Sequence, residues 1–128
     1  MAGFRETVTF SAYEDSLESL QRCAEAAIRN DALSPDAQAM LAGAMDPAEA
    51  FLVNRPHGVE APEVEIWDSG KIAFEWYAAP TRIVNATIDR SGRLVYSALI
   101  GQARIGGVAY GEGKWPSDLI RAISDIRS

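Results

Sequence analysis

The sequence predicts an α+β domain, in which an antiparallel sheet of four or five strands packs one face against N-terminal helices and a C-terminal helix. Three observations lead to this fold. Apolar residues recur at spacings of three and four through residues 11–53, they alternate with other residues over 63–110, and a last apolar stripe follows Pro116. Because the alternating runs follow one another across short turns, we expect a meander of antiparallel strands.

The chain has 128 residues, a length that suits one domain with a single hydrophobic core. We expect residues 1–128 to form that domain, mainly helical over 11–53, a meander over 63–110 and a helix over 116–128. Hydrophobic residues make up 48% of the chain and charged residues 23%, a balance typical of folded globular proteins. Disorder of the whole chain is therefore not expected.

The first helix is predicted over residues 13–29. Ser11 and Glu14 match a capping box, in which a hydroxyl and a carboxylate satisfy the free amides at a helix start. An apolar stripe at helical spacing follows, made of Leu17, Leu20, Ala24, Ala27 and Ile28. Before this helix, a weak alternation over residues 4–10 predicts an edge strand.

Two further helices are predicted before the sheet. The Ser34-Pro35 pair supplies a cap and a proline at the first helical position, so a helix should begin there and run to about Ala44. The Asp46-Pro47 pair repeats this start signal, so a separate short helix is expected over 48–53. Residues 54–62 contain two prolines and a glycine and are predicted to be a connector.

Five strands are predicted, the last of them irregular because of its glycines: residues 64–67, 72–77, 83–88, 93–99 and 105–110. The turns at 68–71 and 89–93 each combine an aspartate, whose side chain closes a turn, with a glycine that tolerates positive φ. In the second strand Ile72, Phe74 and Trp76 share one side, which we expect to face the helices.

The charge of the chain limits its partners. Eighteen acidic against twelve basic residues give a net charge of −6, which repels a phosphate backbone at long range. Direct binding of nucleic acid is therefore disfavoured, and either a solvated surface or an acidic face for a basic protein partner is favoured. The sequence has no signal-peptide pattern and no apolar run of roughly 18 residues, so we expect a cytoplasmic protein without membrane contact.

Reactive residues are scarce. Cys23 is the only cysteine, which excludes an internal disulfide and favours a reducing compartment, and its place on the first helix indicates packing. His57 is the only histidine and stands in the connector, without a nucleophile or metal ligand at a recognisable spacing. We therefore predict no metal, no cofactor and no catalytic residue. The alternative is a small enzyme or ligand-binding domain that uses His57 or Glu75 in a cleft between the connector and the Gly-rich loop.

The best candidate site is the sheet face opposite the predicted core. If Ile72, Phe74 and Trp76 point at the helices, the residues at alternate positions lie on the other face, where aromatic and charged groups form a recognition surface. The predicted partner-binding residues are Trp67, Glu75, Tyr77, Asn85, Thr87, Arg93 and Ser97. The competing interpretation is a solvated antiparallel face without a partner.

Five segments resemble, in order, a family of small uncharacterised bacterial and mobile-element proteins: residues 50–52, Pro62, 72–76, 92–96 and 115–116. They correspond to a helix end with Phe-Leu, a Pro-rich connector, a strand with Glu-Trp, a strand with Tyr and a Pro-started helix. The Glu-Trp strand is the most distinctive of them. Members of this family lie in accessory or mobile genetic regions, so the resemblance implies interaction roles such as inhibitor, antitoxin or immunity factor.

We therefore expect a non-enzymatic protein-binding module, an inhibitor from a phage or other mobile element such as an anti-CRISPR protein. Acidic side chains and the face that carries Tyr77 would compete with nucleic acid for a basic groove on the partner. The other alternative is a structural or antitoxin-like homodimer that pairs through its sheet edge or its sheet face.

Overall fold

The computed structural model describes residues 12–110 and 113–128, with side chains from Ser16 onwards. The predicted strand over 4–10 and the predicted cap Ser11 lie outside the described residues, as does the side chain of Glu14.

The chain forms three helices and one five-stranded sheet within its described part. In sequence order the elements are α1 (Ala12–Arg29), α2 (Pro35–Val53), β1 (Glu63–Ile66), β2 (Ile72–Ala79), β3 (Arg82–Ile88), β4 (Leu94–Ile100), β5 (Ala103–Ala109) and α3 (Ser117–Asp125). The strands lie in the order β1-β2-β3-β4-β5, and each pair of neighbours is antiparallel. This arrangement confirms the predicted α+β fold with an antiparallel meander.

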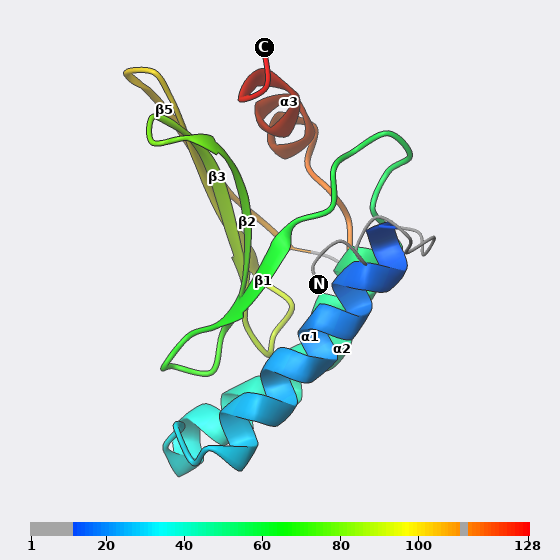
Figure 1. The fold of residues 1–128 in the computed structure, drawn as a ribbon, viewed down its shortest axis with the longest axis vertical. Helices are drawn as coiled ribbons and strands as arrows, with labels where there is room; N and C mark the ends of the chain where they lie inside the picture. Colours follow the sequence, from blue (N-terminus) through cyan, green and yellow to red (C-terminus); the bar gives the residue numbers. More distant parts are fainter. Residues whose placement is uncertain (1–11, 111–112) are drawn as a thin grey trace, which may run out of the picture.

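The helices cover one face of the sheet. In Figure 1, α1 and α2 run side by side at one end of that face, and α3 covers the other end. The opposite face carries no helix from the described residues, which is the arrangement that an antiparallel sheet with one solvated face adopts. The connector 54–62 leads from the end of α2 back to the sheet.

α2 is a single helix, so the predicted break at Asp46-Pro47 is wrong. Pro47 lies inside the helix, where a proline removes one backbone hydrogen bond and costs about 3 kcal/mol. The buried residues of α2 nevertheless form one stripe at helical spacing on both sides of Pro47: Ala37, Leu41, Ala44, Ala48, Phe51 and Leu52. Burying this continuous stripe against the sheet and α1 outweighs the local cost of the proline.

The β1–β2 turn lies directly against α2. Gly70 has a φ of 89° and is buried, and a Cβ at this position would lie 2.1 Å from the carbonyl oxygen of Ala37. The turn therefore needs glycine for two reasons: the backbone conformation, which the sequence predicts, and the close approach of a helix backbone.

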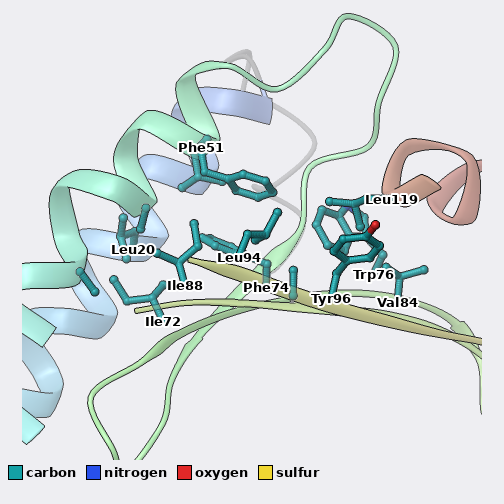
Figure 2. Packing of buried hydrophobic residues seen from close by; sticks show 14 of the residues in the cluster. Leu20, Phe51, Ile72, Phe74, Trp76, Val84, Ile88, Leu94, Tyr96 and Leu119 are labelled. Atoms are coloured by element: carbon teal, nitrogen blue, oxygen red, sulfur yellow. The ribbon is translucent and has the colours of Figure 1, made fainter. Parts of the chain in front are cut away.

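The hydrophobic core lies between the sheet and the three helices. Figure 2 shows Phe51 of α2 pointing towards the sheet and Leu119 of α3 lying over the opposite end. The largest fully buried side chains come from every layer: Trp76, Phe51, Phe74, Leu20, Leu41, Leu52, Ile72, Leu119, Ile126 and Val84. As predicted, Ile72, Phe74 and Trp76 all face the helices.

Four aromatic rings join the layers. The rings of Phe51 and Trp115 stack with centroids 4.0 Å apart, Phe51 also meets Phe74 at 5.0 Å, and Trp76 meets Trp115 edge to face at 5.8 Å. The indole nitrogen of Trp115 donates to the carbonyl of Phe51, and that of Trp76 donates to the carbonyl of Glu60, both at 2.8 Å. The buried polar edges of both tryptophans are thus satisfied.

The last strand and the last helix differ from their predictions. β5 is a regular partner of β4 along all seven residues, and the register shift of the sheet lies in β2, between Tyr77 and Ala79. α3 ends at Asp125 rather than at residue 128. Beyond it, Arg127 makes two hydrogen bonds to the carboxylate of Glu60, which raise the pKa of the guanidinium and attach the C-terminus to the connector.

Candidate protein-binding face

Strand alternation divides the sheet into a buried face and an open face. In β2 the side chains of Phe74 and Trp76 are buried, whereas those of Glu75 and Tyr77 are exposed. We use the name open face for the strand residues on the side away from the helices: Glu63, Glu65, Ala73, Glu75, Tyr77, Ile83, Asn85, Thr87, Val95, Ser97, Leu99, Arg104, Gly106 and Val108.

The register brings the predicted residues of β2, β3 and β4 together. Glu75 pairs with Asn85 and Asn85 pairs with Ser97, so these three residues form one row across the sheet. Thr87 lies in the neighbouring row on one side and Tyr77 in the neighbouring row on the other. Tyr77 is 51% exposed, whereas Thr87 is half-buried between Ala73 and Val95.

Trp67 and Arg93 flank the open face in the two hairpins. Trp67 follows β1, and its amide donates to the carbonyl of Lys71 at 3.0 Å, which continues the strand pairing into the turn. Its side chain is 44% exposed. Arg93 precedes β4 and is half-buried, and its amide donates to the carboxylate of Asp89 at 3.2 Å.

Asp89 organises the β3–β4 turn. Its Oδ1 atom accepts hydrogen bonds from the amide of Ser91 at 2.9 Å, the hydroxyl of Ser91 at 2.6 Å and the amide of Arg93. Burial acts to raise the pKa of Asp89, but these hydrogen bonds and the charge of Arg93 outweigh it, so the pKa lies below its ordinary value.

A hollow of about 400 Å³ lies on the β1–β2 side of the open face. Its lining includes Trp67, Asn85 and three exposed carboxylates, Glu63, Glu65 and Glu75. Glu63 lies directly opposite Glu75, a pairing of like charges that destabilises a sheet. Within the part of the chain that the structure describes, no lysine or arginine forms an ion pair with any of the three. The hollow is therefore suited to a cationic group from another molecule.

The sequence prediction misses part of this face. It includes Glu75 but omits Glu63 and Glu65, because their approach to Glu75 depends on the register in which β1 pairs with β2. It also omits an apolar set, although the alternation places most of its members correctly: Ile83, Val95, Leu99 and Val108. Val108 is 46% exposed, so the face offers apolar area beside its carboxylates.

His57 and Glu75 do not share a cleft. His57 lines a hollow on the helix side of the molecule, together with Glu60, Ile120, Ile123 and other residues of the connector and α3. Glu75 points to the open face. The two side chains therefore belong to different hollows, and the alternative of an enzyme that uses one of them stays a prediction. Cys23 is half-buried, as predicted, and its thiol lies 3.5 Å from the carbonyl oxygen of Val64.

Across 12–110 and 113–128, no three His, Cys, Asp or Glu side chains come together as a metal site requires. None of the described helices combines the length and the apolar character needed to cross a membrane.

Comparison of the chain with protein-family models, with curated proteins and with solved structures gives no match. The resemblance to small bacterial and mobile-element proteins therefore stays a prediction, and the open face is the feature of the molecule that bears on function.

Proposed function

We propose that this protein is a non-enzymatic binding module whose open face takes a basic surface of a protein partner. The observation that carries the proposal is the hollow on that face, which Glu63, Glu65 and Glu75 line together with an exposed tryptophan. None of the three carboxylates has a cationic partner among the described residues. A solvated face without a partner gives no reason to place Glu63 opposite Glu75.

Lysine and arginine side chains fit the chemistry of this hollow. A carboxylate accepts charge-assisted hydrogen bonds from either side chain, and the face of an indole attracts a cation within about 6 Å of its ring centre. A bound cation would also relieve the repulsion between Glu63 and Glu75. Tyr77 and the apolar residues around it supply the contact area that charged groups alone do not provide.

The partner that we favour is the basic groove of a nucleic-acid-binding complex. Such grooves are rich in arginine and lysine, and occupying one would displace nucleic acid without any bond being made or broken. The net charge of −6 supports this mode of action, because it attracts the groove and repels the nucleic acid. The protein would then act as an inhibitor by occlusion, as an anti-CRISPR protein of a phage or mobile element does.

The test is capture of the partner from the native host, followed by measured binding of three purified forms: the unchanged protein, Glu75→Lys and Glu25→Lys. Glu25 is an exposed glutamate of α1, on the helix side, and serves as the matched control. We expect Glu75→Lys to bind at least about tenfold more weakly and Glu25→Lys to bind as the unchanged protein does.

Inhibition by occlusion also predicts competition between this protein and nucleic acid. Nucleic acid added to the preformed complex should displace this protein from the partner, and the weaker-binding Glu75→Lys should be displaced at a lower concentration of nucleic acid. Equal binding by the two glutamate variants, or a complex that holds nucleic acid and this protein together, would exclude the proposal.

A further inference from the structure

The outer edge of β5 is the most open backbone edge of the sheet. Among the described residues β5 pairs with β4 and with no other strand. Five of its seven residues are exposed, and the apolar side chains of Ile105 and Val108 are 39% and 46% exposed. An unpaired edge presents a row of free amides and carbonyls that another strand can bind.

The opposite edge of the sheet is covered in part: β1 pairs with residues 72–75 of β2, and residues 76–79 have no strand partner on that side among the described residues. α1 packs along β1, as Figure 1 shows, and the thiol of Cys23 lies 3.5 Å from the carbonyl oxygen of Val64. Pairing of β5 with β5 of a second copy is isologous, so it uses the same edge of both chains. Such pairing therefore closes at a dimer with two-fold symmetry.

β5 also lacks the features that protect the edges of monomeric proteins. It contains no proline, no lysine and no register shift, and Arg104 is its only charged residue. Natural edge strands carry such features to prevent pairing with other chains. A nearly uncharged edge of this kind is complementary to another nearly uncharged strand, and β5 of a second copy is such a strand.

We propose that the protein forms a homodimer in which β5 pairs antiparallel with β5 of a second copy, with Gly106 on the two-fold axis. The axis between two antiparallel strands is perpendicular to the sheet, so paired residues must point to the same face. Pairing the whole strand, Ala103 with Ala109, meets this condition and places Gly106 opposite itself.

The side chains of β5 complement each other in this register. Ile105 lies opposite Gly107 of the second copy, so the largest apolar residue of the strand meets the smallest. The ring of Tyr96 lies over Gly107, since a Cβ on that glycine would be 2.5 Å from the Tyr96 hydroxyl oxygen. The exposed Ile105 side chain would thus gain an apolar neighbour next to an aromatic ring.

Charge and space also permit the pairing. Arg104 lies opposite Val108 of the second copy, so the Cα atoms of the two Arg104 residues are about 14 Å apart, beyond the screening length of about 8 Å in physiological salt. α3 packs on β3 and β4, which puts the two copies of α3 about 19 Å apart across the axis, further than the 8–10 Å of helices in contact. In the ten-stranded sheet of the dimer, the open faces of the two copies would lie on the same side. The dimer would therefore carry two binding surfaces.

The first test compares Ile105→Lys with Ile28→Lys by size-exclusion chromatography with light scattering. Both isoleucines are exposed, but Ile28 lies on α1, away from β5, and is 54% exposed. We expect the unchanged protein and Ile28→Lys to have twice the chain mass of 13.9 kDa and Ile105→Lys to have that mass once. A monomeric unchanged protein at every concentration, or a dimer that Ile105→Lys leaves intact, overturns the proposal.

The second test examines the register and does not depend on the folding of Ile105→Lys. In a Cys23→Ser background, Gly106→Cys should form an intermolecular disulfide on mild oxidation, because paired Cα atoms lie about 4.5–5.5 Å apart. Ser97→Cys is the control: Ser97 is one strand further in, so its two copies lie about 14 Å apart, too far for a disulfide. A dimer in which Gly106→Cys stays reduced, or in which Ser97→Cys links as readily, contradicts the assigned pairing.

Discussion

Single residues matter most where a side chain closes a turn or where a turn meets another element. Asp89 accepts three hydrogen bonds within its own turn, and the backbone conformation that it supports carries Gly92 at a φ of 82°. Gly70 permits a similar turn against α2. Both hairpins that flank the open face thus depend on an aspartate or a glycine at a defined position.

Asp89→Ala should lower the free energy of unfolding by about 1 kcal/mol at neutral pH, because the turn amides lose their acceptor. The pKa of Asp89 is lowered from 3.8 in the folded state, so its ionised form stabilises the fold fully above 3.8. That contribution is lost as the pH falls through the folded-state pKa. Urea unfolding at several pH values should therefore show a constant gap between the unchanged protein and the variant down to about pH 4, and a narrowing gap below it.

Asp89→Asn is the control, since it keeps an oxygen acceptor and loses the titrating charge. At neutral pH, the free energy of unfolding of Asp89→Asn should lie between those of the unchanged protein and Asp89→Ala. A gap between the unchanged protein and Asp89→Ala that widens in acid would show that the assigned pKa direction is wrong.

At the scale of elements, α2 shows how tertiary packing overrides a local stop signal. Asp46-Pro47 has the composition of a helix start, yet the helix continues because Ala44, Ala48 and Phe51 extend one buried stripe through it. The same helix packs against Gly70 of the β1–β2 turn at Ala37, and its Phe51 belongs to the aromatic cluster. Its length therefore decides where the sheet can dock.

Pro47→Ala should raise the free energy of unfolding by about 1–2 kcal/mol, because the variant restores a helical amide and removes the ring from the helix interior. Part of the gain is offset by the larger entropy of the unfolded chain. Ala42→Pro is the matched control at an exposed position of the same helix and should cost about 3 kcal/mol or more. Denaturant unfolding measures the change in free energy of unfolding for both variants. A loss of stability in Pro47→Ala would contradict the conclusion that the proline destabilises α2.

At the scale of the whole molecule, the aromatic cluster connects segments that are far apart in the sequence. Trp115 precedes α3, Phe51 lies near the end of α2, and Phe74 and Trp76 belong to β2. The cluster joins the helix layer to the sheet and sets the position from which α3 begins. The open face keeps its shape because this opposite side is rigidly packed.

Trp115→Ala should lower the free energy of unfolding by about 3 kcal/mol, since it removes the stacked ring and the hydrogen bond to Phe51. Trp115→Phe keeps a ring stacked on Phe51 and should lose less stability than Trp115→Ala does. Trp67→Ala, beside the open face, is the control and should lower the free energy of unfolding by less than about 1 kcal/mol. Thermal unfolding, with near-ultraviolet circular dichroism to report on the rings, distinguishes the three variants, and equal losses at Trp67 and Trp115 would argue against the cluster.

The sequence predicts the five strands, the hairpin turns and the buried side of β2 because these depend on neighbouring residues. A two-residue alternation places Glu75, Tyr77, Asn85 and Ser97 on one face without knowledge of any distant contact. The same local rule fails at Pro47, where the outcome depends on packing between elements.

By itself, the sequence determined the class of fold and the face on which the candidate residues lie, because strand period and turn chemistry are local properties. Only the tertiary structure decided that Glu63 stands opposite Glu75, that His57 and Glu75 lie on opposite sides of the sheet, and that α1 packs along β1 while β5 has a single strand partner among the described residues. These facts depend on register and on the docking of helices, which arise from contacts between residues distant in the chain.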